Sequence, residues 1–355
     1  MCIFMPTIVI MSAVNIKQLA QQLNLSISTV SRALNDSYDI SPETRKKVLD
    51  LAKKLNYQPN PHASSLRKHS SKTIAVVVPE IANNFFALAI NGIQSAAREK
   101  GYHVLIYVTN ENDKIESESL KHLQNGRIDG LLISVSNKTV NDEDLFRIQE
   151  QGIPLVFFDR VRDEFETAKV TTDDFESGFK ATEHLINQGC KRIAYLQISK
   201  NLSIGMNRMR GYLEALKKYN LKEEKKLIVD CVDDREKNYT AIETLLKSKE
   251  RPDGIFASVE HLAITSYLVC KDLKLKIPKD VKIISFSNLE TASLLNPSLT
   301  TITQPAFDIG KEAAAILIKA LTKKGFTLTN SKLVLPSRLV QRESTAKSLT
   351  AKMIE

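Results

Sequence analysis

Short apolar runs alternate with amphipathic stretches across residues 73–321, and this alternation restricts the fold more than any other feature of the chain. Continuous apolar runs are typical of strands that are buried on both faces of a sheet, and such strands occur where helices cover both sides. Strands that alternate with helices in this way pair in parallel. The sequence therefore predicts an α/β region with doubly wound parallel sheets.

The alternation occurs in two similar sets. The first set predicts strands at 74–78, 104–108, 130–135 and 154–158, and helices at 86–100, 115–125 and ending at 151. The second set predicts helices at 178–188, 208–219, 239–247 and 262–273, and strands at 192–197, 227–232, 254–257 and 282–286. Two similar halves predict two lobes around a cleft, with ligands bound beyond the carboxyl ends of the strands. A last helix, 309–321, is expected to cross back to the first lobe.

The first 72 residues have a different character. They hold ten Lys and Arg residues against four Asp and Glu residues, so about +6 of the net charge of +9 lies in the first fifth of the chain. A basic terminal segment favours a polyanionic partner, although a solvated face or a membrane-surface patch can carry the same charge.

Three short helices are predicted within this basic segment. Asn15, Ser26 and Ser41 are residue types that cap helices, and Pro42 suits the first turn of the third helix. Apolar residues follow each cap at helical spacing: Ile16, Leu19, Ala20 and Leu23, then Val30, Ala33 and Leu34, then Val48, Leu51, Ala52 and Leu55. With a tight turn at residues 24–25, this pattern predicts a helix-turn-helix bundle, whose second helix enters the major groove of DNA.

The outer face of the second helix carries side chains that suit DNA. Arg32 can donate two hydrogen bonds to guanine or contact a phosphate. Ser28 and Thr29 can bond to base edges or to the backbone, and Ile27 can pack on a thymine methyl group.

These residues resemble the DNA-binding headpiece of the LacI/GalR family of bacterial transcription regulators. The matching runs are residues 16–20, 26–35, 41–45 and 55–60, in the family's order. The resemblance implies that Ile27, Ser28 and Arg32 carry much of the base readout, and that Ser31 and Asn35 lie closer to the DNA backbone. The full set of candidate DNA-binding residues is Ser26, Ile27, Ser28, Thr29, Ser31, Arg32, Asn35, Tyr57, Asn60, Ala63 and Leu66. The alternative is an unrelated three-helix bundle.

Residues 60–67 connect the headpiece to the larger region. Asn60 can cap a helix and Pro61 can begin one, yet so short a helix is unstable alone in water. The resemblance implies a hinge helix that pairs with its twin in the minor groove, where Leu66 wedges between base steps and bends the duplex. The alternative is a plain linker.

The larger region resembles the periplasmic-binding-protein-like effector domain of the same regulators. The matching runs are residues 157–160, 183–185, 192–194, 208–212 and 297–302. Eight residues are candidate effector contacts: Phe85, Phe86, Asp159, Arg208, Glu260, Ser287, Asn288 and Gln304.

The candidate effector contacts offer aromatic, acidic and basic groups. Phe85 and Phe86 could stack on a sugar or base face. Asp159 could accept hydrogen bonds from hydroxyl groups, and Arg208 could hold a carboxylate, a phosphate or a ring oxygen. Alternatively, Phe86 is a core residue and Asp159 pairs with a neighbouring arginine.

Two positions depart from the pattern of the sugar-binding members. Residues 259–260 are Val-Glu where those members usually have Asn-Asp, and residues 285–287 are Ser-Phe-Ser where they usually have Gly-Phe-Asp. Two polar sugar contacts are thereby missing or altered. This leaves open a modified or acidic sugar, another metabolite, or control by a protein partner.

Other classes of protein find no support in the sequence. The four cysteines lie far apart and the six histidines show no metal-ligand spacing, so we expect neither a disulfide framework nor a metal site, and His184 suits a structural hydrogen bond. No nucleotide-binding or hydrolase motif is present, so we expect no cofactor and no catalytic residues. No apolar stretch approaches the ~18 residues of a membrane span, and residues 1–13 lack the pattern of a signal peptide. We therefore expect a cytoplasmic protein without a membrane partner, with Met11 as the candidate initiator.

The expected organisation follows from these patterns. Residues 1–13 are a disordered or misassigned start, 14–59 a helix-turn-helix domain, 60–72 a hinge and linker, 73–345 a two-lobed core and 346–355 a tail. Lobe one is expected at 73–170 and 300–330, and lobe two at 171–299 and 331–345.

The predicted function is that of a sequence-specific transcriptional regulator, by family default a repressor. Such a homodimer would bind double-stranded DNA at a palindromic operator, under the control of a small-molecule effector, by resemblance a sugar or sugar derivative. The alternative is a solute-binding protein that uses the same two-lobed core without DNA binding.

Overall fold

The chain forms two units, residues 1–71 and 72–355, each with its own hydrophobic core. The computed structural model describes residues 14–57, 70–124, 127–137, 142–198 and 200–346. Within these ranges, no helix is both long enough and apolar enough to cross a membrane.

The described part of the first unit contains three helices: α1 (Ile16–Leu23), α2 (Ile27–Leu34) and α3 (Pro42–Lys54). The three expected caps are confirmed, because the side chains of Asn15, Ser26 and Ser41 each accept a hydrogen bond from the backbone N–H three residues later. Asn24 ends α1 in the left-handed conformation, with φ of 49°, and so turns the chain into α2. The core consists of apolar side chains from all three helices, among them Leu19, Val30, Ala33 and Val48.

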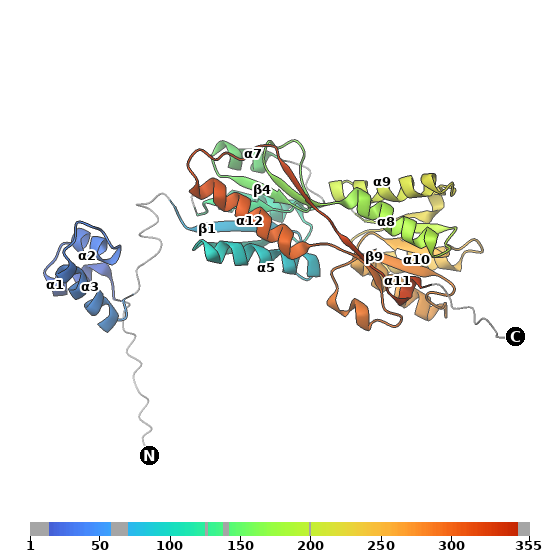
Figure 1. Cartoon of the computed structure of the whole chain (residues 1–355), viewed down its shortest axis with the longest axis horizontal. Coiled ribbons are helices and arrows are strands. Elements are labelled where there is room, and N and C mark those ends of the chain that lie inside the picture. Colours follow the sequence, from blue (N-terminus) through green and yellow to red (C-terminus); the bar gives the residue numbers. More distant parts are fainter. Residues whose placement is uncertain (1–13, 58–69, 125–126, 138–141, 199, 347–355) are drawn as a thin grey trace, which may run out of the picture. The chain divides into compact units, whose positions relative to one another are not determined.

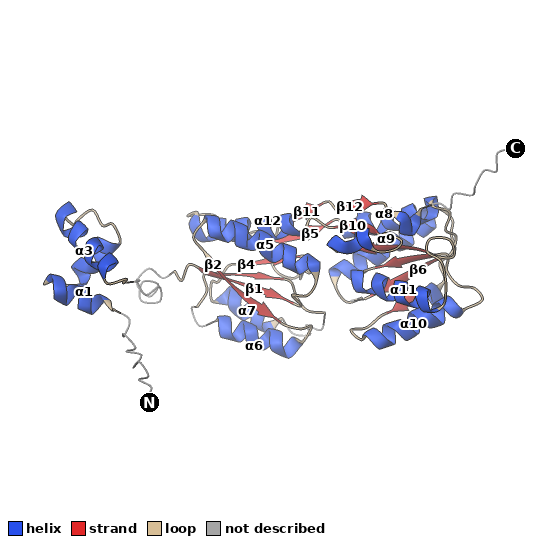
Figure 2. Cartoon of the chain, turned by 90° about the horizontal axis from the view of Figure 1, so that it is seen from below, coloured by secondary structure: helices blue, strands red, loops and turns tan. Residues whose placement is uncertain are grey.

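The first lobe of the second unit is built on a parallel six-stranded sheet in the order β11-β5-β4-β3-β1-β2. Its strands are β1 (Thr73–Val78), β2 (His103–Val108), β3 (Gly130–Ile133), β4 (Leu155–Phe158), β5 (Lys169–Thr172) and β11 (Lys332–Leu335). One face is covered by α5 (Asn84–Glu99) and α12 (Ala306–Thr322), and the other by α6 (Asp113–Leu123) and α7 (Glu143–Glu150) (Figure 2).

The second lobe repeats this plan with the strand order β12-β10-β9-β8-β6-β7. Its strands are β6 (Ile193–Gln197), β7 (Ile228–Asp230), β8 (Gly254–Ala257), β9 (Lys282–Phe286), β10 (Thr300–Thr303) and β12 (Arg338–Val340), of which β12 runs antiparallel to β10. Helices α8 (Asp174–Asn187) and α9 (Ser203–Lys218) cover one face, and α10 (Arg235–Lys247) and α11 (Glu260–Asp272) cover the other. The residues that the structure describes also include three short 3-10 helices: η1 (Lys225–Leu227), η2 (Glu290–Leu294) and η3 (Glu343–Thr345).

The predicted pair of doubly wound lobes is confirmed, as is the return of the last long helix to the first lobe. Helix α12 packs so closely on α5 that a Cβ atom on Gly310 would overlap the carbonyl group of Ala89. The three cysteines within the described residues, Cys190, Cys231 and Cys270, are free and buried. His184 makes the expected structural hydrogen bond, at 2.8 Å between its Nε2 and Thr345 Oγ1.

The sheets correct the expected lobe boundaries. Strand β10 was expected in the first lobe but pairs with β9 in the second sheet, whereas β11 was expected in the second lobe but pairs with β5 in the first. The boundary expected after residue 170 cuts through β5. The physical reason is common to all three crossings, because each segment joins a sheet as a strand before it crosses to the other lobe. The crossing after α12 can be followed in Figure 1.

Candidate functional site

Helix α2 presents a polar outer face beside a buried inner one. Ile27 is 43% exposed, Ser28 and Arg32 are exposed and Thr29 is half-buried, as their predicted role requires. The hydroxyl oxygen of Ser26 lies 2.7 Å from that of Ser28 and 2.8 Å from that of Thr29, so the three hydroxyl groups form one cluster at the start of the helix.

Other candidate DNA-binding residues lie differently. Ser31 is buried on the inner face, and its carbonyl oxygen accepts a hydrogen bond from the exposed Asn35 side chain at 2.7 Å. Tyr57 is half-buried against the core of the first unit, and this burial raises the pKa of its phenol. Asn60, Ala63 and Leu66 lie outside the described residues.

The eight candidate effector residues come together in the second unit. Phe85, Phe86, Asp159, Arg208, Glu260, Ser287, Asn288 and Gln304 all line one small chamber of about 40 Å³, together with Asn83, Arg160, Ile204, Val259 and Phe286. Four of these residues, Asn83, Arg160, Val259 and Glu260, also line a larger cleft of about 1000 Å³. Because α5 and β4 belong to the first lobe and α9 and α11 to the second, the chamber lies between the lobes.

The two phenylalanines are core residues as well as chamber walls. Phe85 and Phe86 are 7% and 2% exposed, and their rings meet edge to face at 5.3 Å. The guanidinium group of Arg160 lies 5.5 Å from the centre of the Phe86 ring. The alternative that Phe86 belongs to the core is therefore confirmed, and only part of its surface is available to a ligand.

Asp159 follows β4 in the left-handed region, with φ of 59°, and is almost fully buried. Burial raises the pKa of its carboxyl group to about 6, although the Arg160, Arg208 and Gln304 side chains all act to lower it. The alternative that Asp159 pairs with a neighbouring arginine is confirmed, as a long ion pair with 3.9 Å between its Oδ2 and Nε of Arg160.

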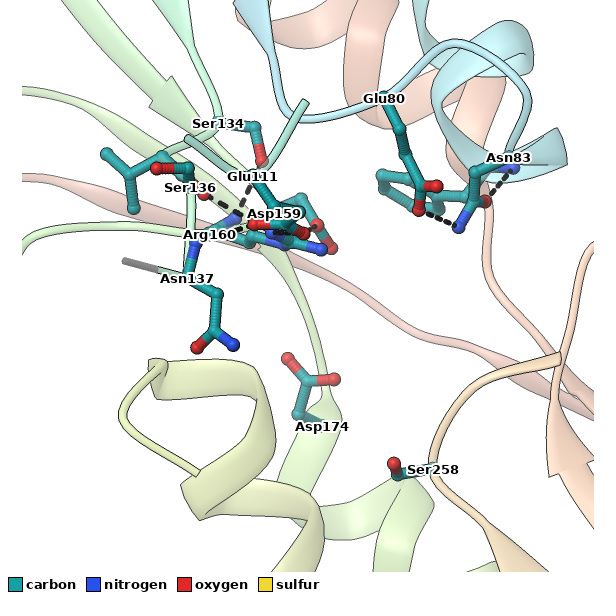
Figure 3. A network of polar contacts seen from close by, with 12 residues as sticks. Glu80, Asn83, Glu111, Ser134, Ser136, Asn137, Asp159, Arg160, Asp174 and Ser258 are labelled. Atoms are coloured by element: carbon teal, nitrogen blue, oxygen red, sulfur yellow. Dashed lines mark hydrogen bonds and ion pairs between the residues drawn. The ribbon is translucent and has the colours of Figure 1, made fainter. Parts of the chain in front are cut away.

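Arg160 pairs more closely with Glu111, a residue that the sequence did not indicate. Its Nη1 atom donates to Oε1 of Glu111 at 2.7 Å, and Oε2 of Glu111 accepts a hydrogen bond from the backbone N–H of Asn137 at 2.7 Å. Figure 3 shows this group, with Asp159 beside Arg160 and with Asp174 and Ser258 on the facing elements.

Arg208 is buried and firmly held. Its Nε atom donates to Oδ1 of Asp174 at 2.7 Å, its Nη1 atom donates to the carbonyl oxygen of Ser258 at 2.8 Å, and its guanidinium plane lies 3.8 Å from the centre of the Phe286 ring. A Cβ atom on Gly178 would lie 2.5 Å from the Arg208 carbonyl oxygen, so glycine allows α8 to bring Asp174 to this position. Burial raises the pKa of Asp174, while Arg208 acts to lower it.

Polar contacts join the two lobes at the chamber. The Glu260 carboxylate accepts a hydrogen bond from Asn84 Nδ2, in the first lobe, at 3.1 Å and another from Ser287 Oγ, in the second, at 2.9 Å. Asn288 Nδ2 donates to the backbone carbonyl oxygen of Gln304 at 2.7 Å. The residues that depart from the sugar-binding pattern are thus themselves connected.

Comparison with known proteins identifies the family to which this chain belongs. A family model described as "Bacterial regulatory proteins, lacI family" matches residues 15–60, and one described as "Periplasmic binding proteins and sugar binding domain of LacI family" matches residues 71–343. Catabolite control protein A of Priestia megaterium is 30% identical over 94% of this chain and 99% of its own length. The ribose operon repressor of Halalkalibacterium halodurans is 31% identical over 93% of this chain and 96% of its own length.

A solved structure shows the same likeness. The transcriptional regulator CelR, in complex with cellobiose, aligns with 93% of this chain and 99% of its own, with a TM-score of 0.70 and 26% sequence identity. Both matched regions coincide with units that the fold separates, a capped helix-turn-helix and a two-lobed core. The chain therefore belongs to the lacI family of bacterial regulatory proteins, which are DNA-binding transcriptional repressors with a sugar-binding type of domain.

Proposed function

We propose that this protein binds a palindromic DNA operator as a homodimer and represses transcription, and that a small-molecule effector in the interlobe chamber controls operator binding. The observation that carries the proposal is that all eight sequence-predicted effector residues line one chamber in a chain that also has a capped helix-turn-helix. The capped helix-turn-helix is not needed for solute binding, so it favours a DNA-binding regulator over a solute-binding protein.

The chemistry of the chamber supports a ligand rich in hydroxyl groups, a sugar or sugar derivative. Oδ1 of Asn288 and Nε of Arg160 are buried and have no hydrogen-bond partner among the described residues. Buried polar atoms are costly unless they are paired, and a hydroxyl group can serve either atom because it both donates and accepts. The names of two similar proteins include a sugar: the ribose operon repressor and the CelR–cellobiose complex.

The position of the chamber supports control of one site by the other. A ligand there would touch both lobes, since Phe86 of the first lobe and Arg208 of the second both line the chamber. Such a ligand favours whichever lobe arrangement it binds more tightly. Coupling of this kind is reciprocal, so an effector that weakens operator binding is itself bound less tightly by the operator complex. The hinge predicted at residues 60–67 is the proposed link between the lobes and the DNA.

The experiment begins with selection of genomic fragments by the full chain, followed by a thermal-shift screen with sugars and sugar acids. We expect palindromic sites, and at least one compound that both raises the melting temperature and changes operator affinity. Ser287→Ala removes one chamber hydroxyl and should weaken that compound's effect while it leaves operator binding without the compound unchanged. A compound that stabilises the protein but leaves its operator affinity the same with and without the compound would contradict control through the chamber.

A further inference from the structure

The loop between α2 and α3 places two carboxylates beside the candidate DNA-reading face. Asp39 Oδ2 lies 2.5 Å from Nη1 of Arg32 on α2, and Asp36 pairs with Arg45 on α3. Carboxylates at a surface that approaches phosphates reduce affinity for any DNA. Each of the two carboxylates forms an ion pair here, but only Asp39 pairs with a residue of the candidate reading helix.

The backbone of the loop holds Asp39 in this position. Asp36 adopts the left-handed conformation, with φ of 58°, and the N–H of Ser37 donates to the carbonyl oxygen of Arg32 at 3.1 Å. The N–H of Ile40 then donates to the carbonyl oxygen of Ser37 at 3.3 Å. The loop is thus folded back over the end of α2, so that Asp39 reaches a guanidinium group seven residues earlier in the chain.

Asp39 carries a negative charge, and it is the one hydrogen-bond partner of the Arg32 side chain among the described residues. A hydrogen bond from the Ser37 side chain, together with Arg32, holds the pKa of Asp39 below its usual value. The Arg32 side chain is 53% exposed, and its only hydrogen bond among the described residues is the one to Asp39. An exposed arginine loses side-chain entropy when it docks on a ligand, and a partner that orients it beforehand reduces that loss.

We propose that Asp39 is a specificity-determining residue, which holds the Arg32 guanidinium so that its free edge addresses one base pair of the operator. The inference rests on the proposed function, in which α2 reads bases. The guanidinium is a planar fork of five N–H donors, so a bond at Nη1 restricts the orientations that the whole group can take. The edge formed by Nε and Nη2 is left for a pair of acceptors such as N7 and O6 of guanine.

Asp39 also acts against the competing use of Arg32. Arginine binds phosphate as readily as it binds guanine, but a phosphate beside Asp39 meets a negative charge. Discrimination increases when the wrong contact is penalised as well as when the right one is favoured. Both effects raise the ratio of specific to non-specific DNA binding.

The chain supplies a matched control. Asp36→Asn and Asp39→Asn each remove one negative charge from the same loop and one ion pair to an arginine, yet only Asp39 contacts the reading helix. The wild-type chain and both variants are used, at full length, to select sites in parallel from a library of randomised DNA duplexes at one salt concentration.

The expected result is a loss of preference at one position of each half-site in Asp39→Asn alone. A good bidentate contact discriminates roughly 5- to 150-fold between bases, and we expect Asp39→Asn to reduce that ratio about fivefold or more. Both variants should bind unselected duplex slightly more tightly than the wild type. Asp39→Glu, which keeps the charge but moves it, should retain part of the preference.

The results distinguish failure of the Asp39 inference from failure of the proposed function. Unchanged base preference in a folded Asp39→Asn protein, or an equal loss of preference in Asp36→Asn, would overturn the inference while the proposed function stands. Base preference that Arg32→Ala leaves intact would also overturn it, because Arg32 would then read no base. If the wild-type chain selects no site at all, the proposed function itself fails.

Discussion

Asp159 combines burial with a carboxyl group whose pKa is raised to about 6 from an ordinary value of 3.8. Between these pH values the folded protein keeps a proton that the unfolded chain has lost, so stability falls as pH rises through this window. A shift of about two pKa units corresponds to at most about 3 kcal/mol. We expect Asp159→Asn, which cannot ionise, to be more stable than the wild type above pH 6 and to lose that advantage near pH 4. Urea unfolding at both pH values measures the difference, and a difference independent of pH would contradict the argument.

Arg32 is the residue on which base readout depends most directly. Its exposed side chain lies on the outer face of α2, and a bidentate contact to guanine is worth about 1–3 kcal/mol of discrimination. We expect Arg32→Ala to lose that amount on the selected site and much less on unrelated duplex. Fluorescence anisotropy on both duplexes gives the two affinities. An equal loss on every sequence would show that Arg32 contacts a phosphate instead.

At the scale of the element, the helices of the first unit depend on their caps. The hydroxyl groups of Ser26 and Ser41 each accept one backbone N–H, at 3.1 and 3.2 Å, which would otherwise lack a partner. We expect Ser26→Ala and Ser41→Ala to destabilise the headpiece by similar amounts, about 0.5–2 kcal/mol each. Thermal unfolding of the headpiece measures both. We expect only Ser26→Ala also to weaken operator binding at temperatures where both variants are folded, because Ser26 caps the reading helix α2 and Ser41 caps α3.

The hinge is the second element with a distinct prediction. Leu66 lies outside the described residues, and its proposed function is to wedge between base steps in the minor groove. We expect Leu66→Ala to weaken operator binding and to reduce the bend in the DNA, measured by gel mobility of circularly permuted fragments. If the Leu66→Ala variant bends the DNA as much as the wild type does, Leu66 does not act as a wedge.

Elements were predictable where the cause is local. The caps at Asn15, Ser26 and Ser41 follow from residue type and position, and the buried central strands follow from unbroken apolar runs. Strands β5, β10, β11 and β12 were not predicted, because each has only three or four residues and none is an unbroken apolar run. Such short segments become strands only because a neighbouring strand supplies hydrogen bonds, and a single sequence does not reveal that neighbour.

At the scale of the whole molecule, the sequence predicted which side chains meet the chamber but not how they are paired there. Asp174 and Arg208 are 34 positions apart, and their contact depends on the close packing of α8 on α9. Glu111 and Arg160 are 49 positions apart and meet only because β2 and β4 end at the same edge of one sheet. Side-chain contacts of this kind depend on tertiary structure, and no local sequence pattern predicts them.

The central claim is that the first unit confers DNA binding and the second confers its control. The most direct measurement compares the full chain with a chain that lacks residues 1–67, on the selected operator and over a range of salt concentrations. We expect tight, salt-dependent binding by the full chain and no operator binding by the truncated chain, which should remain a folded dimer and still bind the effector. Operator binding by the truncated chain with the same salt dependence as the full chain would contradict it.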